Sequence, residues 1–382
     1  MIIDIYHNIR WSRYKARVFS ALHRQGIATG VDIRFTQIAD TSDDRTTLSG
    51  VELGFHQYPH QLLFPGSYDL VPKWKLASTL FSHVMRAESD LVLIPGYDQL
   101  EYWSMLAAAI LTNKKRGVFC DSTLLDRKQL WIKSIFKRLF FHFCDIFFGY
   151  GIRSRELLMH YGANPNFIFQ RCQAAALPDA YDINNVRELR LRSAPSSNAP
   201  RFLYVGRLSQ EKGIETLIYA FAKVYIEIRN ANLVLVGGGP LMNKLKSLAF
   251  SLGIETAVEF AGSANQETLA SYYTHATCLI LPSYSEPWGL VVNEALHYGC
   301  PVVVSDRCGC VPELVHDSVT GYTFRAGDEN DLSDKLLRLV DEFTDLTQVT
   351  NRCLDVISIY TPDAAAEQIL NGCRHILSPN FT

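Results

Sequence analysis

The stretch Glu286-Pro-Trp-Gly-Leu-Val-Val-Asn-Glu294 places two carboxylates eight positions apart around the expected start of a helix. The run before it, Cys278-Leu-Ile-Leu-Pro-Ser283, is apolar and stops at a proline, which indicates a buried strand that ends in a loop. Glu286 is therefore expected on a strand-to-helix turn. Two surface glutamates beside an ordinary helix would have the same spacing, so the rest of the chain has to separate the two interpretations.

The residues between the two glutamates suit an anionic ligand. Gly289 lets the backbone approach a ligand closely, and the first free amides of the helix, at Leu290 and Val291, point outward as an anion site. Glu294 lies four residues beyond Leu290 and shares its helix face, within reach of a sugar hydroxyl beside bound phosphates. This combination predicts a site for a nucleotide sugar.

The length and composition of the chain predict two globular domains. Its 382 residues exceed one ordinary core, and 48% of them are hydrophobic while 20% are charged. The net charge of −2 hides an asymmetry: residues 1–180 carry 21 Lys+Arg and 16 Asp+Glu, about +5, and residues 181–382 carry 16 and 23, about −7. A basic first half suits an anionic membrane or phosphate, and ordinary surface variation explains it as well. No nucleic-acid partner is expected.

Nine cysteines follow no disulfide framework, and several fall inside apolar runs, which indicates reduced core thiols. Cys308-Gly-Cys310 lacks a second ligand pair at the usual spacing, so we expect no metal there. The first residues contain an acid at position 4 and no basic region, and they are interpreted as a strand and not a signal peptide. No run of about 18 apolar residues occurs, so a membrane would be met from its surface.

The first half alternates strand-like and helical patterns, which is typical of a parallel sheet covered by helices. Residues 40–72 are irregular and receive no assignment. The expected strands and helices of this half are, respectively, 1–6, 90–95, 116–120 and 146–150, and 13–25, 73–87, 99–112 and 128–143.

A second α/β unit follows a change in amino-acid composition. Residues 181–200 are rich in Asp, Asn, Arg and Ser and are interpreted as a linker between an N-terminal domain, 1–180, and a C-terminal domain, 201–360. The last segment, 361–382, contains a helix starting at Pro362 that could pack back on the N-terminal domain. The expected strands of the second domain are 201–206, 232–236, 257–261, 277–282 and 301–305.

The loop after the first strand of the second domain reads Gly206-Arg-Leu-Ser-Gln-Glu-Lys-Gly213. Ligands of open α/β sheets bind at the carboxyl ends of strands, where this loop lies. Arg207 offers a planar fork and Lys212 a compact charge, so together they can neutralise a diphosphate and the charge that develops when its sugar bond breaks. A solvated loop with two cations is the alternative.

Six ordered blocks between residues 200 and 325 make this half resemble retaining glycosyltransferases of family 4, which have the GT-B fold. The resemblance implies two doubly wound, Rossmann-like α/β domains that face a central cleft. The N-terminal half resembles the family only in its alternating pattern. The blocks are Gly206-Arg-Leu-x-x-Glu-Lys-Gly213, Leu235-Val-Gly-Gly-Gly-Pro240, Phe260-Ala-Gly262, Pro282-Ser283 with Glu286-x7-Glu294, Gly299-Cys-Pro-Val-Val303 and Gly321.

The resemblance also implies roles for single residues. Arg207 and Lys212 would contact the donor diphosphate, Glu286 would lie at the transferred sugar, and Glu294 would hold the ribose. Backbone contacts to the donor are implied at Gly206, Gly237, Gly262, Gly289, Leu290 and Val291. The donor phosphate would take the acceptor proton, so the implied reaction is a retaining hexosyl transfer from a UDP- or GDP-linked sugar without metal or cofactor.

Two segments of the N-terminal half depart from the family pattern. Residues 7–14 replace a Gly-Gly turn, and their Arg10 and Arg13 either contact phosphate or face solvent. Where relatives often place a histidine near the donor sugar, this chain has Asp121 at a strand end. Asp121 is a candidate catalytic residue that would hold a sugar hydroxyl or steady positive charge at the anomeric carbon, or it is an ordinary helix cap.

Residues 128–141 bear on the identity of the acceptor. In this segment Lys128, Lys133, Lys137 and Arg138 are mixed with Trp and Phe. This composition suits a helix on an anionic bilayer, and a core helix with a few exposed lysines explains it equally well. We expect a lipid-linked or oligosaccharide acceptor in exopolysaccharide, O-antigen or similar glycan synthesis, at the cytoplasmic face of the plasma membrane. The alternatives are a soluble glycosyltransferase with a small acceptor and a nucleotide-sugar-binding subunit without turnover.

Overall fold

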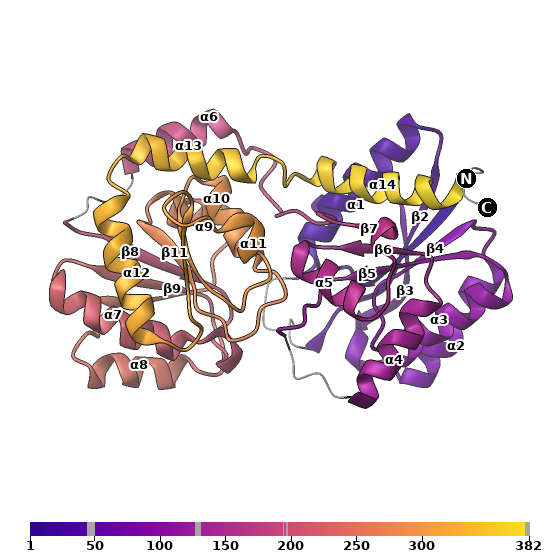
Figure 1. Ribbon diagram of the computed structural model, residues 1–382, viewed down its shortest axis with the longest axis horizontal. Helices are drawn as coiled ribbons and strands as arrows, with labels where there is room; N and C mark the ends of the chain where they lie inside the picture. Colours follow the sequence, from indigo (N-terminus) through magenta and orange to yellow (C-terminus); the bar gives the residue numbers. More distant parts are fainter. Residues whose placement is uncertain (44–49, 127–130, 194, 196–197, 379–382) are drawn as a thin grey trace. The chain divides into compact units, whose positions relative to one another are not determined.

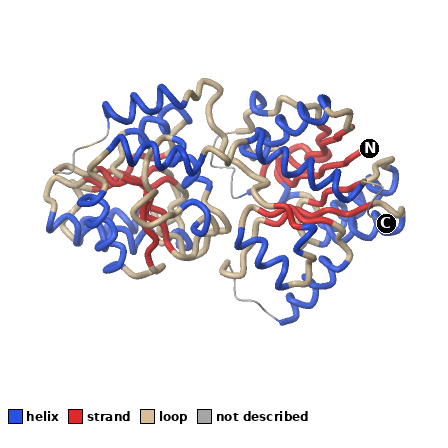
Figure 2. The backbone as a smooth tube through the Cα atoms, turned by 45° about the horizontal axis from the view of Figure 1, so that its top comes forward, coloured by secondary structure: helices blue, strands red, loops and turns tan. Residues whose placement is uncertain are grey.

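The computed structural model describes residues 1–43, 50–126, 131–193, 195 and 198–378, and the chain divides into two compact units. Unit 1 consists of residues 1–124, 128–176 and 360–382, and unit 2 of residues 125–127 and 177–359 (Figure 1). Each unit is a parallel sheet with helices on both faces (Figure 2). The predicted architecture of two doubly wound α/β domains is confirmed.

Unit 1 contains a seven-stranded parallel sheet in the order β3-β2-β1-β4-β5-β6-β7. Successive strand residues point to opposite faces, so Tyr6 and Val92 enter one buried apolar layer while Ile5 and Leu91 enter the other. The strands are β1 (Ile2–Ile9), β2 (Asp32–Thr41), β3 (His60–Ser67), β4 (Leu91–Ile94), β5 (Lys115–Cys120), β6 (Ile146–Gly149) and β7 (Ile168–Phe169). The helices are α1 (Arg13–Ala28), α2 (Lys73–Arg86), α3 (Leu100–Leu111), α4 (Trp131–His142), α5 (Ile152–His160) and α14 (Pro362–Leu377).

The last helix of the chain, α14, belongs to unit 1. Its residues Ala365, Ala366 and Ile369 are buried in the layer that also contains α1, and Arg24 of α1 pairs with Asp363 at 2.9 Å. Figure 1 shows α14 running beside α1. The N-terminal domain is therefore built from both ends of the chain.

Unit 2 contains a six-stranded parallel sheet in the order β10-β9-β8-β11-β12-β13. Its strands are β8 (Arg201–Val205), β9 (Asn232–Val236), β10 (Val258–Gly262), β11 (Cys278–Leu281), β12 (Val302–Ser305) and β13 (Gly321–Phe324). Its helices are α6 (Ile183–Ser193), α7 (Ile214–Glu227), α8 (Met242–Ser251), α9 (Gln266–Thr274), α10 (Leu290–His297), α11 (Val311–Leu314), α12 (Glu329–Glu342) and α13 (Leu346–Ile357).

The predicted linker at 181–200 is wrong over most of its length, because residues 183–193 form α6 of unit 2. Asp182 caps this helix by accepting hydrogen bonds from the amides of Asn184 and Asn185 at 2.7 and 3.0 Å. Only Val186 and Arg190 are buried, four residues apart on one face. Because only this narrow stripe is buried, most residues of α6 are polar, and its composition resembles that of a linker.

Four strands have no counterpart among the expected ones: β2, β3, β7 and β13. In β2 the buried polar residues Thr36 and Gln37 interrupt the alternation of apolar and polar residues. β3 contains Pro65 and Gly66, which break the apolar pattern at the edge of the sheet. β7 has two residues and is likewise an edge strand. Each is fixed by pairing with a neighbour and not by its own composition.

Two further properties bear on the sequence expectations. All nine cysteines lie in described segments, none forms a disulfide, and eight of them are buried. Among the helices of the described segments, none combines the length and apolar character that a membrane span requires.

Each sheet reverses its strand order at one point. In unit 1 the neighbours β1 and β4 flank this switch point, and in unit 2 the neighbours are β8 and β11. Ligands of doubly wound sheets bind at the carboxyl ends of such strand pairs. The loops after β1, β4, β8 and β11 are therefore the places to search for function.

Candidate functional site

The loop after β8 is held in a defined shape by its own residues. Gly206 has a φ of +154°, and the Tyr204 hydroxyl donates to the carbonyl of Arg207 at 2.8 Å. The loop closes with a short 3-10 turn, Gln210–Lys212, and with Gly213 in the left-handed region at a φ of +65°. Arg207 and Lys212 are thereby presented at the carboxyl edge of the sheet.

This loop packs against the loop after β11, on the other side of the switch point. The amide of Tyr284 donates to the carbonyl of Glu211 at 2.8 Å, and the hydroxyls of Thr216 and Tyr284 are 2.8 Å apart. A side chain at Gly213 would clash with the carbonyl oxygen of Pro282. Glycine at 213 is therefore required both by its φ and by this close approach.

The closest contact between the two loops is an ion pair. Lys212 Nζ lies 2.5 Å from Glu286 Oε2, and the side chains are only 22% and 15% exposed. Arg207 is more open and lies 3.5 Å from Glu211. Desolvation alone would raise the pKa of Glu211, but the hydrogen bond from Ser209 and the charge of Arg207 hold this pKa below its usual value. The structure thus joins two residues 74 positions apart that the sequence assigned to one site.

A third segment fixes the backbone around Glu286. The Gly309 amide donates to the Glu286 carbonyl at 2.9 Å, and the Cys310 amide donates to the Trp288 carbonyl at 3.1 Å. A side chain at Gly309 would clash with the carbonyl of Pro287. Cys308-Gly-Cys310, where the sequence predicts no metal, is thus a segment of close backbone packing, and its run of small residues is the signal for this role.

Glu294 lies on α10, which begins directly after Gly289, whose φ is +104°. The amides of Leu290 and Val291 occupy the first turn, where no residue of the same helix accepts from them. The Tyr273 hydroxyl donates to Glu294 Oε2 at 2.7 Å, and burial beside this carboxylate raises the pKa of Tyr273 well above its usual value. Tyr273 therefore fixes the orientation of Glu294, a contact that the sequence did not indicate.

Three glycine turns lie side by side at the ends of β8, β9 and β10. The Gly206 amide donates to the carbonyl of Val236 at 3.0 Å, and the Gly237 amide donates to that of Gly262 at 2.7 Å. Gly237 has a φ of +132° and Gly262 one of +71°. The next helix, α8, begins at Met242 and not directly at the glycines. The predicted donor-binding residues of unit 2 thus line one edge of one sheet.

Arg10 and Arg13, the predicted phosphate contacts, belong to unit 1. Arg10 pairs with Asp40 and Arg13 with Glu52, each at 2.5 Å, and both arginine side chains are largely buried. A phosphate would have to compete with these carboxylates. The remaining candidate residue of the N-terminal half is Asp121, which follows β5.

Asp121 lines a cavity of about 590 Å³ in unit 1. Asp121 keeps an exposed surface, yet the atoms packed around its carboxyl group raise the pKa by desolvation, and the nearby Lys15 ammonium opposes the rise. Lys15 is 4% exposed, its Nζ lies 4.6 Å from the centroid of the Phe119 ring, and burial lowers its pKa to about 8. Nothing in the sequence marks Lys15 as buried, because a lysine in a helix is usually solvated.

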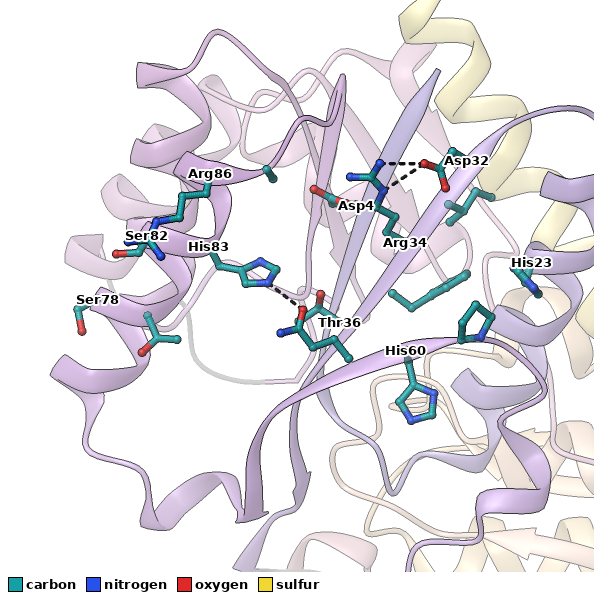
Figure 3. Close-up of a pocket in the computed structure, with 16 residues that line it drawn as sticks. Asp4, His23, Asp32, Arg34, Thr36, His60, Ser78, Ser82, His83 and Arg86 are labelled. Atoms are coloured by element: carbon teal, nitrogen blue, oxygen red, sulfur yellow. Dashed lines mark hydrogen bonds and ion pairs between the residues drawn. The ribbon is translucent and has the colours of Figure 1, made fainter.

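A larger cavity of about 980 Å³ lies elsewhere in unit 1, between the first residues of β2 and β3 and the helix α2 (Figure 3). Several of its polar groups have partners: Arg34 pairs with Asp32 at 3.1 Å, and His83 contacts Gln61 at 3.1 Å. Asp32 and His60 are the first residues of their strands, so this cavity lies away from the carboxyl ends. Its position makes it a weaker candidate than the smaller cavity.

The expected membrane helix is described from Trp131 onward as α4, and Lys128 lies outside the described residues. In α4 only Phe140 and Phe141 are buried. The end of α4 thus packs in the core of unit 1, as the core-helix alternative expects, while its first turns do not. The apolar residues it exposes are Trp131 (73%), Ile132 (51%), Ile135 (55%), Phe136 (56%) and Leu139 (44%).

No group of three or more His, Cys, Asp or Glu side chains in the described segments is arranged to hold a metal ion. The positive charge of the unit 2 site comes from Lys212, Arg207 and the first amides of α10. These groups suit an anionic ligand at the carboxyl edge of the sheet.

Comparison with known proteins agrees with this geometry. Residues 185–351, which all belong to unit 2, match the family described as glycosyl transferases group 1. The chain is 32% identical over 166 residues to the alpha-monoglucosyldiacylglycerol synthase of Streptococcus pneumoniae, covering 44% of this chain and 37% of that protein. It is 30% identical over 193 residues to the D-inositol 3-phosphate glycosyltransferase of Streptomyces bingchenggensis, covering 48% and 42%. These matches span less than half the length of each relative.

Solved structures resemble the whole chain in fold. A lipopolysaccharide outer core galactosyltransferase, WaaB, superposes with a TM-score of 0.73 over 98% of this chain and 99% of that one, at 16% identity. HepE of Anabaena in complex with UDP and glucose gives 0.70 over 98% and 100%, also at 16% identity. The fold is therefore GT-B, and residues 185–351 of its second unit match the glycosyl transferases group 1 family.

Proposed function

We propose that this protein is a retaining, metal-independent glycosyltransferase that moves a hexose from a UDP- or GDP-linked sugar to a hydroxyl of a glycan or lipid-linked acceptor. The observation that carries the proposal is the junction of the two switch-point loops of unit 2, where Lys212 meets Glu286. Cations for a diphosphate and a carboxylate for a sugar are thus fixed at one edge of one sheet. The group 1 domain supports this assignment.

In the proposed reaction Arg207 and Lys212 bind the donor diphosphate and stabilise the charge that develops on it as the sugar bond breaks. Glu286 holds the transferred sugar and orients Lys212 through their ion pair. The acceptor hydroxyl attacks the anomeric carbon on the face that the nucleotide leaves, and its proton passes to the departing phosphate. Glu294, oriented by Tyr273, binds the ribose.

A binding experiment tests the donor half of the proposal. Thermal unfolding of the full chain is measured with UDP, GDP and ADP, and one nucleotide at 100 times its dissociation constant should stabilise unit 2 by about 2.7 kcal/mol. Lys212→Met should abolish this shift, while Lys335→Met, a control distant in sequence on α12, should retain it. Absence of a shift with all three nucleotides would contradict the proposal.

A product analysis tests the reaction itself. Incubation with the stabilising nucleotide's sugar should release that nucleotide and, with an accepted glycan, give a glycoside whose anomeric configuration equals that of the donor. Nucleotide binding without any release, at all acceptors tried, would instead favour a non-catalytic subunit. An epimerised donor sugar would point to a different reaction on the same fold.

We propose that α4 lies on an anionic membrane surface and brings the enzyme to a lipid-linked acceptor at the cytoplasmic face of the plasma membrane. The helix exposes a row of apolar side chains together with the cations Lys133 and Arg138. Among similar proteins, the S. pneumoniae synthase is named for a diacylglycerol product and WaaB for the lipopolysaccharide core. Both names are compatible with this acceptor class.

Vesicle flotation tests the membrane surface. The protein should float with vesicles that contain anionic phospholipid at low salt and remain unbound with neutral vesicles. Trp131→Ser with Phe136→Ser should abolish flotation, whereas Trp74→Ser, which removes an equally exposed tryptophan (71%) from α2, should not. Equal flotation of the two variants would remove α4 from the interaction.

A soluble enzyme with a small acceptor is the second candidate. It is favoured by the Streptomyces relative, which is named for inositol 3-phosphate. Transfer to a water-soluble acceptor by protein that does not float with anionic vesicles would support this candidate and contradict the membrane proposal.

A further inference from the structure

The 590 Å³ cavity of unit 1 lies where a doubly wound sheet binds its ligands. Its walls include Asn8 near the carboxyl end of β1, Pro95 after β4 and Asp121 after β5. β1 and β4 flank the switch point of this sheet. The volume falls within the roughly 300–1,000 Å³ that is typical of small-molecule sites. Position and size thus mark it as a ligand site independently of its charge.

The walls combine aromatic rings with hydrogen-bonding groups. Tyr68, Tyr97 and Tyr102 supply rings with an apolar body, and Gln99 and Asn8 supply amides. Tyr68 is fixed from behind, because its hydroxyl donates to Glu101, a fully buried carboxylate that also lies 3.2 Å from Lys73 Nζ. This support makes the wall a preformed surface.

The charge of the lining is acidic. Asp43, Asp69, Asp98 and Asp121 line the cavity, and no Lys or Arg does so among the residues that the structure describes. Two cations pack on wall residues: Lys15 Nζ lies 4.6 Å from the Phe119 centroid, and Lys73 Nζ 4.7 Å from that of Tyr68. A phosphate or carboxylate group in the cavity would meet like charges without a lining cation.

The carboxylates are separate hydrogen-bond acceptors. Asp98 is exposed and makes no hydrogen bond or ion pair with any described residue, and Asp69 accepts only from the Asp43 amide, at 2.8 Å. In the described segments no three carboxylates converge as ligands of one metal ion. Acceptors spread around a cavity with aromatic walls fit the several hydroxyl donors of one ring.

We propose that this cavity binds the acceptor through an uncharged, hydroxyl-rich ring such as a pyranose, and that its carboxylates exclude phosphorylated or carboxylated acceptors. The inference rests on the proposed function and names the substrate class of its acceptor side. Asp98 is the leading specificity residue, because its carboxylate is available to accept a ligand hydroxyl. This sets the chain apart from its relative named for inositol 3-phosphate.

Ligand-observed NMR on the full chain tests the inference with two matched probes, methyl α-D-glucopyranoside and D-glucose 6-phosphate. The glucoside should show saturation transfer, and the phosphate should not. Asp98→Asn should weaken glucoside binding about tenfold, as expected for loss of a hydrogen bond to a charged acceptor. Asp98→Lys should admit glucose 6-phosphate. Asp32→Asn, which changes an exposed carboxylate at the first residue of β2, is the control and should leave both results unchanged.

Three results would each overturn the inference. They are equal binding of the two probes, no binding of the glucoside at about 20 mM, and an Asp98→Asn variant that binds the glucoside as well as the wild type does. The nucleotide thermal shift is measured on the same samples. If nucleotides shift the unfolding temperature but the glucoside does not bind, only the proposed acceptor class is contradicted. If no nucleotide shifts the unfolding temperature, the proposed function itself is contradicted.

Discussion

At the scale of single residues, the chemistry of unit 2 depends on one ion pair. Lys212 and Glu286 are held 2.5 Å apart by loops that are themselves joined through the Tyr284 amide and the Glu211 carbonyl. The pair is mostly buried, so each partner keeps the other in place before a donor arrives. Substitutions at the two positions should therefore differ in effect from substitutions at exposed charges nearby.

We expect Lys212→Met to lower kcat for sugar transfer about 10²- to 10³-fold, because it removes a charge that stabilises the leaving diphosphate. Arg325→Met, at an arginine that is 79% exposed after β13, should change kcat less than twofold. Steady-state kinetics on both variants make the comparison. A Lys212→Met enzyme with kcat near that of the wild type would exclude this role for the ammonium.

Gly309 should be intolerant of a side chain, because its position places any Cβ against the carbonyl of Pro287. We expect Gly309→Ala to cost about 1–3 kcal/mol in the free energy of unfolding of unit 2 and to raise the donor KM by displacing Glu286. Gly54→Ala is the control, since nothing lies within 4 Å of its added Cβ. Urea unfolding and donor kinetics on the two variants decide whether the close approach matters.

His7 gives unit 1 a dependence on acid. Burial lowers the pKa of His7 to about 3, while the unfolded chain has the ordinary value of 6.5. Above pH 6.5 both states are neutral and stability is complete; as pH falls from 6.5 toward 3, the unfolded state gains a proton that the folded state refuses, so stability is lost. The loss from pH 7 to pH 5 should be about 2 kcal/mol. The unfolding free energy is measured in urea at both pH values. Its decrease from pH 7 to pH 5 should be smaller in His7→Gln than in the wild type, by about this amount.

At the scale of elements, α6 is held to unit 2 by Arg190. This side chain is 1% exposed, and its Nη1 donates to the carbonyls of Tyr273 at 3.2 Å and Thr274 at 2.9 Å and to that of Ala276. These are the carbonyls at and just beyond the end of α9, which no residue of that helix satisfies. The guanidinium therefore caps one helix from another.

We expect Arg190→Met to destabilise unit 2 by about 3 kcal/mol, because three buried carbonyls lose a charged donor. Arg192→Met on the same helix is the matched control: Arg192 is 76% exposed and, among the described residues, pairs only with Glu188, so its change should stay within about 0.5 kcal/mol. Chemical denaturation of both variants tests the difference. Equal stability of the two would mean that α9 needs no such cap.

At the scale of the whole molecule, the N-terminal domain is completed by the C-terminal helix. α14 buries Ile369 and Leu370 in the layer that contains α1 and β1 of unit 1. A side chain at Gly372 would clash with Phe148 of β6, so the helix lies close to the sheet. Folding of unit 1 therefore depends on α14.

We expect Ile369→Ala to cost about 2–5 kcal/mol in the stability of unit 1 and to leave nucleotide affinity in unit 2 within twofold. Two unfolding transitions, of which only the nucleotide-independent one moves, would agree with this expectation. A shift of the nucleotide-stabilised transition alone would contradict the assignment of α14 to unit 1.

The parts of the fold that the sequence predicted have strong local patterns. Strands such as β4 and β11 are continuous apolar runs, and α1 and α7 repeat apolar residues at helical spacing. Edge strands β3 and β7 and the helix α6 bury few residues, so their composition resembles that of loops. Their neighbours, and not their own residues, determine their structure.

The candidate site divides in the same way. Arg207, Lys212, Glu286 and Glu294 stand in glycine-punctuated motifs that the sequence alone displays. Gly309, Tyr273 and Lys15 act only through contacts with distant segments, and no spacing in the chain announces such contacts.

The sequence by itself determined the two-sheet architecture and the donor-binding residue types, because apolar periodicity and glycine turns act over a few neighbouring positions. The tertiary structure decided which loops meet at each switch point, that both ends of the chain build unit 1, that α4 exposes its apolar side chains, and that acidic groups line the unit 1 cavity. These features depend on strand order and packing between residues far apart in the chain, which local composition does not encode.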